Sequence, residues 1–142
     1  MDVEEICSII VDCGFKLHRD IGPGLLESAY ETIFAAQLVA SGLKVDRQLP
    51  IDIEYRGQRL PAAFRIDLLI NEQVLIELKS TEHTLPVHSK QLITYLRLTG
   101  LTHGFVINFG TATFKDGIRR LLNDPTRFVP LWLRANQKDF QP

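Results

Sequence analysis

The chain has few cysteines and no long apolar run. Its 142 residues include two cysteines, Cys7 and Cys13, which lie six residues apart in a segment with helical periodicity. Because this spacing puts them on different helix faces, they do not form a metal-ligand pair, and we expect free buried thiols. No apolar run approaches the roughly 18 residues of a membrane span, and the first residues are acidic where a signal peptide needs positive charge. We therefore expect a cytoplasmic protein that has no membrane partner.

The chain also lacks an excess of charge of either sign. Sixteen Lys and Arg residues against 17 Asp and Glu residues give a formal net charge of -1. This balance argues against a generally basic surface for nucleic acid, so phosphate binding must come from a local cluster or a bound cation. The length and the 45% content of hydrophobic residues predict one globular domain over residues 1–142 with a substantial core.

The pattern of apolar residues predicts an α/β fold with a mixed central sheet and helices on both faces. The helix over residues 25–42 is apolar on most of its circumference, which predicts that it is buried. In the tail from residue 127 to 142 we expect a strand or a docking segment. The expected elements are helices over 3–19 and 25–42, three antiparallel strands within 45–80 with turns at 56–58 and 71–73, a helix over 86–98, a strand over 103–109 and a helix over 113–122. The residues interpreted as aromatic core are Phe105, Phe109, Phe114 and Trp132.

Two acidic side chains are expected to meet on neighbouring strands. If Ile70 pairs with Val74 across the 71–73 turn, Asp67 lies opposite Glu77 on the same sheet face, and Lys79 follows on that face. The other face of the Asp67 strand would carry Phe64, Ile66, Leu68 and Ile70.

Such a pair of carboxylates suits a divalent cation. Adjacent carboxylates repel and raise each other's pKa, so losing Asp67 is expected to preserve or raise the stability of the metal-free protein. Mg²⁺ takes oxygen ligands and keeps several waters, so Asp67, Glu77 and the backbone carbonyl of Leu78 are suited to hold it beside a phosphate. Lys79 would then lie beside the bound water or the scissile phosphate, which is an arrangement typical of phosphodiesterases.

These motifs resemble those of a known nuclease superfamily. Ile66-Asp67, followed by Glu77-Leu78-Lys79, is similar to the Asp and Glu-x-Lys pair of the PD-(D/E)XK nucleases, with Ile66 in place of the superfamily's proline. Gly24, Glu27 and Tyr30 match the signature of the small bacterial GxxExxY group within it. Gln91 and Tyr95 resemble the Gln-x-x-x-Tyr element of its recombination-associated exonucleases. The likeness covers roughly residues 15–122.

The resemblance implies a restriction-endonuclease-like fold and a phosphodiesterase that uses Mg²⁺ (or Mn²⁺) and acts on DNA. Asp67 and Glu77 would bind the metal, and Glu27 would anchor it directly or through water. Lys79 would help to orient or activate water. Gln91 and Tyr95, which share a helix face, would position Lys79 and the substrate phosphate.

Each of these residues also has a simpler interpretation. Asp67 and Glu77 would be solvated side chains paired with Arg65 and Lys79. Glu27 would complement the helix dipole, and the Gln91 helix would turn its polar side to water. The competing functions are a non-catalytic module, binding nucleic acid or dependent on a partner, and a structural homodimerisation module that uses the Trp132 tail.

Overall fold

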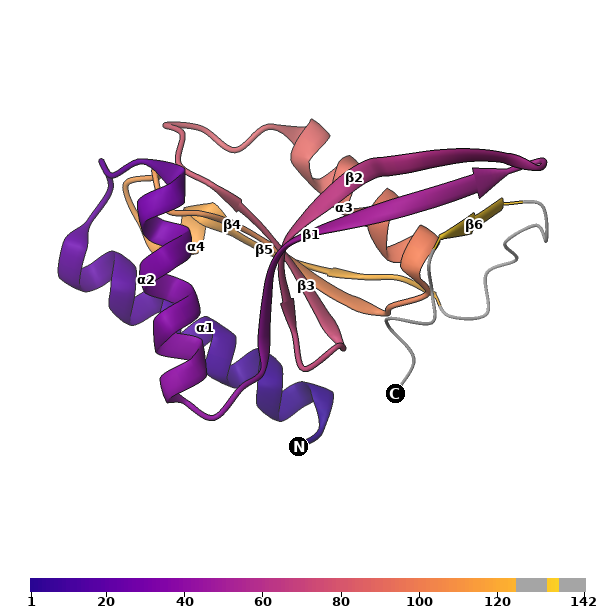
Figure 1. The fold of residues 1–142 in the computed structure, drawn as a ribbon. Coiled ribbons are helices and arrows are strands. Elements are labelled where there is room, and N and C mark those ends of the chain that lie inside the picture. The colour runs from indigo at the N-terminus through magenta and orange to yellow at the C-terminus, as the bar shows by residue number, and fades with distance from the viewer. Residues whose placement is uncertain (125–132, 136–142) are drawn as a thin grey trace.

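The computed structural model describes residues 1–124 and 133–135 and has a single sheet with helices on both faces (Figure 1). The sheet order is β5-β4-β3-β2-β1-β6; β3 and β4 are parallel and all other neighbours are antiparallel. The elements are α1 (Val3–Ile21), α2 (Glu27–Ala40), β1 (Val45–Tyr55), β2 (Gln58–Ile70), β3 (Val74–Lys79), α3 (Pro86–Thr99), β4 (His103–Asn108), α4 (Phe114–Gly117), β5 (Ile118–Leu122) and β6 (Leu133–Ala135). The predicted α/β fold with a mixed sheet is therefore confirmed.

Local signals set the ends of the long helices. Asp2 caps α1, since its carboxylate accepts the backbone N–H of Glu5 while the Glu5 side chain accepts the N–H of Asp2. Pro86 opens α3, where a missing N–H costs nothing. Gly100 ends α3 in the left-handed conformation, with φ of 76°. This helix is the crossover that joins the parallel strands β3 and β4.

Two hydrophobic cores lie on opposite faces of the sheet. Helices α1 and α2 cover one face, where Phe34 of α2 and Phe109 are fully buried. Helix α3 covers the other through Leu92 and Leu96. Only one side of α2 is buried, and Val39 on the opposite side is 57% exposed, so the prediction of a helix buried on most of its circumference is wrong.

The predicted helix over residues 113–122 is also wrong. Helix α4 has only four residues, and the chain then continues as β5, which pairs with β4 from Ile107↔Ile118 to His103↔Leu122. The open N–H and C=O groups along β4 require partners, and satisfying them outweighs the helix propensity of the sequence Arg119-Arg120-Leu121.

Other expectations have mixed outcomes. Cys7 is a free, buried thiol as predicted, whereas Cys13 is free but only half buried. Phe105, Phe109 and Phe114 are core residues, and Trp132 lies outside the described residues. The tail contributes β6, which pairs with the outer half of β1. Among the helices that the structure describes, none has the length and apolar composition needed to cross a membrane.

Candidate functional site

The site is located where strands β2 and β3 stop pairing. Their described pairs run from Ile70↔Val74 to Leu68↔Ile76, in the predicted register. Asp67 comes next in β2, and its Oδ2 accepts the backbone N–H of Leu78 at 2.8 Å. The Asp67 carboxylate thus accepts a β3 backbone N–H in place of a backbone carbonyl. This hydrogen bond holds the carboxylate beside β3.

An irregularity in β1 accompanies this change. The pairs Arg47↔Leu68 and Leu49↔Ile66 flank Gln48, which has a left-handed backbone with φ of 50°. The β1–β2 register is the same on both sides of Gln48, and it shifts between Ile51 and Ile53. Strand β2 contributes to both cores, so the prediction that four apolar residues of β2 share one face is wrong. Phe64 and Ile66 pack with α3, whereas Leu68 and Ile70 pack beneath α1 and α2.

Glu77, which is buried, forms an ion pair with the partly exposed Lys79. Glu77 is 8% exposed, and its Oε1 lies 3.4 Å from Nζ of Lys79. Burial and the nearby Asp67 carboxylate raise the pKa of Glu77 to about 7, although Lys79 opposes this rise. Burial also raises the pKa of Asp67, against the hydrogen bonds from Leu78 and Gln48.

The simpler interpretation of this pair as a solvated face is wrong. Glu77 is buried, and Arg65 contacts the backbone oxygen of Gln48 at 3.5 Å and not the Asp67 carboxylate. Among the described contacts, the predicted ion pair between Glu77 and Lys79 is present and the one with Arg65 is not.

Glu27 approaches the pair from the first turn of α2. Partial burial raises the pKa of its carboxyl group; Lys79 lowers it, and Asp67 and Glu31 raise it further. The side chain of Glu27 is exposed, and among the described contacts no hydrogen bond or ion pair joins it to the site. The structure therefore brings Asp67, Glu77 and Lys79 together from β2 and β3, and Glu27 acts on them through its charge.

Helix α3 contributes one of its two candidate residues to this site. Tyr95 stacks on Phe64, with ring centroids 4.1 Å apart and planes at 12°. Burial raises the pKa of Tyr95, and the Glu77 and Asp67 carboxylates raise it further. Gln91 is exposed, and among the described contacts no hydrogen bond joins it to Lys79.

Sequence reasoning missed Glu31 and Gln48. Glu31 is only 7% exposed; its Oε2 accepts N–H groups of Arg47 at 2.9 and 3.2 Å, and its Oε1 accepts from Gln48. Gln48 Nε2 also lies 3.3 Å from Asp67 Oδ1. The available signal was a second glutamate one helical turn after Glu27, on the side of the helix that carries Phe34.

The donor set fits a hard divalent cation. Asp67 and Glu77 offer carboxylate oxygens that repel each other without a counterion, and Mg²⁺ is commonly held by one or two carboxylates and water. Within residues 1–124 and 133–135, no group of three or more His, Cys, Asp or Glu side chains is arranged around a possible metal position. The residues thus fit an ion bound by two carboxylates, a backbone oxygen and water better than a closed cage of side chains.

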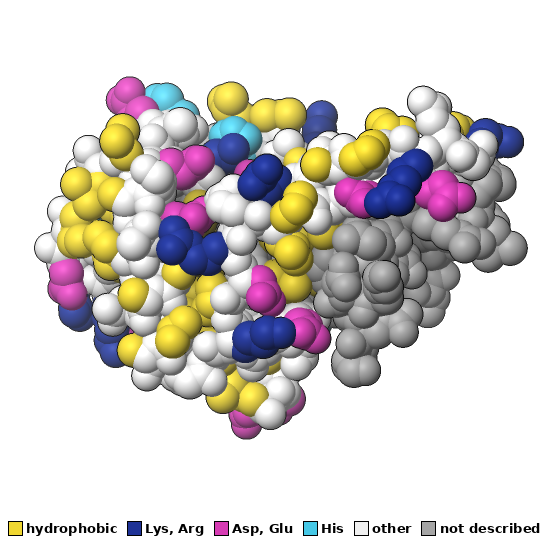
Figure 2. Space-filling model, in the orientation of Figure 1, with side chains coloured by type: hydrophobic (Ala, Val, Ile, Leu, Met, Phe, Trp, Pro, Cys, Tyr) yellow, Lys and Arg dark blue, Asp and Glu magenta, His cyan; other side chains and the backbone are white. Residues whose placement is uncertain are grey.

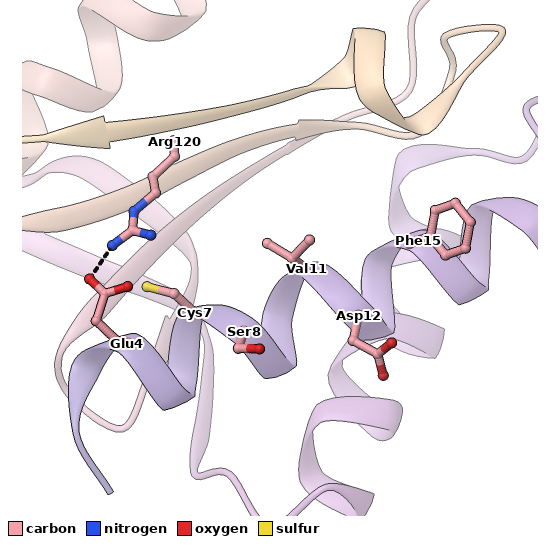
Figure 3. Close-up of a pocket in the computed structure, with 7 residues that line it drawn as sticks. All are labelled: Glu4, Cys7, Ser8, Val11, Asp12, Phe15 and Arg120. Carbon is pink, nitrogen blue, oxygen red and sulfur yellow. Dashed lines mark hydrogen bonds and ion pairs between the residues drawn. The ribbon is translucent and has the colours of Figure 1, made fainter.

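A separate hollow of about 480 Å³ lies between α1 and β5 (Figure 3). Across it, Nη2 of Arg120 contacts Oε1 of Glu4 at 2.5 Å, which ties β5 to the start of α1. Its other lining residues lie along α1, and none of them belongs to the Asp67–Glu77 site.

Basic side chains do not gather into one broad patch on the face shown in Figure 2. Lys and Arg side chains alternate there with acidic and apolar ones. This distribution agrees with the net charge of -1 and leaves local contacts as the source of any phosphate binding.

Comparison with known proteins gives one match. A family model described as the PD-(D/E)XK nuclease superfamily matches residues 4–121, which is most of the chain. No curated protein and no solved structure matches the chain.

Proposed function

We propose that this chain, which belongs to the PD-(D/E)XK nuclease superfamily, is a divalent-metal-dependent phosphodiesterase that acts on DNA. The observation that carries the proposal is the placement of the Asp67 and Glu77 carboxylates beside Lys79, at the point where β2 and β3 separate. Burying two carboxylates together is costly, and a cation between them removes that cost. The superfamily itself suggests a nucleic-acid substrate.

We also assign the chain to the GxxExxY group, on the basis of Gly24, Glu27 and Tyr30. The structure supplies a reason for the tyrosine. Its hydroxyl donates to the carbonyl of Gly22 and accepts the N–H of Leu25 at 3.2 Å, while its ring stacks on Phe109. Tyr30 therefore fixes the loop before α2, and Glu27 is the first residue of that helix.

The proposed ligands of Mg²⁺ or Mn²⁺ are Asp67, Glu77 and the carbonyl oxygen of Leu78, with Glu27 bound directly or through water. When bound, such an ion stabilises negative charge on the phosphate oxygens. The Leu78 N–H fixes Asp67 from one side, which reduces the freedom that the carboxylate loses on binding.

Lys79 is proposed to orient the attacking water and the scissile phosphate. Its ammonium lies 3.4 Å from Oε1 of Glu77, and this ion pair holds it at the site. Tyr95 lies on α3, and the charges of both carboxylates raise the pKa of its hydroxyl. We propose that Tyr95 and Gln91 contact the phosphate, Gln91 through a side chain that is exposed and free to turn toward the substrate.

A non-catalytic nucleic-acid-binding module is the second candidate. The observation in its favour is that the described residues offer no three-side-chain metal group. Such a module would bind nucleic acid without cleaving it, and Lys79 would be one phosphate contact among several.

Single-turnover cleavage of labelled single- and double-stranded DNA, with Mg²⁺ and with Mn²⁺, separates the two candidates. Lys79→Ala should leave metal binding nearly intact and slow cleavage by at least about 10²-fold, the usual scale for a positioned catalytic group. Lys90→Ala, an exposed lysine on α3, is the matched control and should cleave like the parent.

Glu77→Ala is the control for contamination. Cleavage that persists equally in Lys79→Ala and Glu77→Ala would come from a contaminating nuclease. A pure parent protein that binds DNA but cleaves no substrate with either metal would favour the binding module.

A further inference from the structure

We propose that Gln48 is a positioning residue of the candidate site, whose side-chain amide bridges Glu31 and Asp67 and fixes the direction of the Asp67 carboxylate. This inference rests on the proposed function, because it assigns Gln48 a task only if Asp67 binds the metal.

The contacts of the amide allow one orientation. Nε2 of Gln48 contacts Oε1 of Glu31 and lies 3.3 Å from Oδ1 of Asp67. Both neighbours are carboxylate oxygens, which only accept hydrogen bonds, so the NH₂ group with its two N–H donors must face them. The amide thus separates two negative groups that would otherwise repel each other.

Both carboxylates are anchored at their other oxygen. Oε2 of Glu31 accepts from Arg47, and Oδ2 of Asp67 accepts the N–H of Leu78. Gln48 therefore completes a continuous chain of hydrogen bonds from α2 to β3 that uses both oxygens of each carboxylate. With both oxygens held, the Asp67 carboxylate has a single orientation.

The backbone of Gln48 supports the same conclusion. Its φ of 50° is in the left-handed region, which glycine adopts freely and residues with a long side chain rarely adopt. Unfavourable backbone conformations of this kind cluster at functional sites, where the surrounding structure holds them in place. At this position the side chain reaches Asp67, and a glycine would give the same turn without the amide.

The test compares Gln48→Gly with Ala62→Gly. Ala62 lies in β2, which forms a hairpin with β1, and its backbone is also left-handed, with φ of 48°. It is therefore a matched control for relieving backbone strain. We expect both variants to stay folded in EDTA, and Ala62→Gly to keep or raise the thermal midpoint. Only Gln48→Gly should lose Mn²⁺ affinity in isothermal titration calorimetry, by about 10- to 100-fold, with a parallel loss in single-turnover DNA cleavage.

A second variant, Gln48→Asn, keeps an amide on a residue that tolerates the left-handed region. Its side chain is one methylene shorter and does not span both carboxylates, so it should lose Mn²⁺ affinity as Gln48→Gly does. Parent-like Mn²⁺ affinity in Gln48→Gly would overturn the positioning role and leave the proposed function standing. An equal loss in Ala62→Gly would also overturn it. A parent that neither binds Mn²⁺ nor cleaves DNA would overturn both proposals.

Discussion

At the scale of single residues, Asp67 makes a structural bond in addition to its proposed role. Its Oδ2 accepts the N–H of Leu78, a residue that is 1% exposed. If repulsion from Glu77 were the only effect, Asp67→Ala would keep or raise the free energy of unfolding without metal. The hydrogen bond to Leu78 acts in the opposite direction. Removing the acceptor strands a buried N–H group.

We therefore predict opposite outcomes for two substitutions. Asp67→Ala should lower the free energy of unfolding in EDTA by about 1–3 kcal/mol, because the Leu78 N–H loses its acceptor. Asp67→Asn keeps an acceptor oxygen and removes the charge, so its stability should equal or exceed that of the parent. Urea unfolding measures both. Equal stability of the two variants would show that the bond to Leu78 contributes nothing.

Both Asp67 variants should lose the stabilisation that Mn²⁺ gives the parent. A ligand that binds only the folded state stabilises it by mass action, and that gain disappears with the ligand site. A parent-like rise in thermal midpoint on adding Mn²⁺ to Asp67→Asn would count against Asp67 as a ligand.

Glu77 should make the stability of the metal-free protein depend on pH. Its pKa rises from 4.5 to about 7, so between these values the folded state binds more protons than the unfolded state. Stability must then fall as pH rises through this interval. The charged groups that act on Glu77 are Asp67, Lys79 and Glu27.

The measurement is urea unfolding in EDTA from pH 5 to pH 8. Glu77→Gln removes the titration, so the stability of the parent relative to this variant should decline across the interval. A difference that stays constant from pH 5 to pH 8 would mean that the pKa of Glu77 is not raised.

The sequence allows some of these residues to be predicted and not others. A short turn connects the strands that carry Asp67 and Glu77. Once this turn is recognised in the sequence, the strand register puts the two residues side by side. Gln48 lies opposite Asp67 because the β1–β2 register shifts between Ile51 and Ile53, and strand alternation contains no signal for such a shift. The roles proposed for the site residues stay predictions.

At the scale of secondary-structure elements, a close approach explains why α4 ends where it does. A Cβ built on Gly117 would lie 2.1 Å from the carbonyl oxygen of Asn108 and 2.5 Å from Oγ1 of Thr111. Without a shift of its neighbours, position 117 has room only for glycine as the chain enters β5. The sequence alone shows Gly117 in a segment of helix formers, and it does not show that Asn108 is adjacent.

Gly117→Ala should therefore destabilise the protein, by about 1–3 kcal/mol or more, because backbone atoms must move to admit the methyl group. Lys115→Ala is the control within the same short helix, since Lys115 is exposed and its loss should change stability by less than about 0.5 kcal/mol. Chemical denaturation compares the two. A parent-like Gly117→Ala would show that the loop after β4 adapts without cost.

At the scale of the whole molecule, the positive charge that a phosphate needs must come from a few local groups or a bound cation. The net charge is -1, and the proposed site contributes several carboxylates that repel phosphate. The net charge follows from counting residues and does not depend on packing, and the alternation of charges on the face shown in Figure 2 agrees with the expectation of no broadly basic surface. That residues 1–142 form one domain stays a prediction.

We predict that DNA binding depends on divalent ions. Lys79→Ala, which should cleave at least about 10²-fold more slowly than the parent, is expected to bind a labelled DNA at least about 10-fold more weakly in EDTA than in Mn²⁺, as measured by fluorescence anisotropy. A double variant, Asp67→Asn with Glu77→Gln, should bind better than the parent in EDTA and gain nothing from Mn²⁺. Equal affinity of Lys79→Ala with and without the ion would contradict the prediction.

The position of β5 has a consequence for self-association. It ends the described sheet order, so its outer N–H and C=O groups have no neighbouring strand among the described residues. Open strands of this kind invite other chains to add to the sheet and aggregate. Strand β5 is short and carries Arg119 and Arg120, which alternate between its two faces. Arg120 is paired with Glu4, so Arg119 is the side chain that would bring like charges together if a second β5 were added there. This like charge makes the end of the sheet resist growth into fibrils.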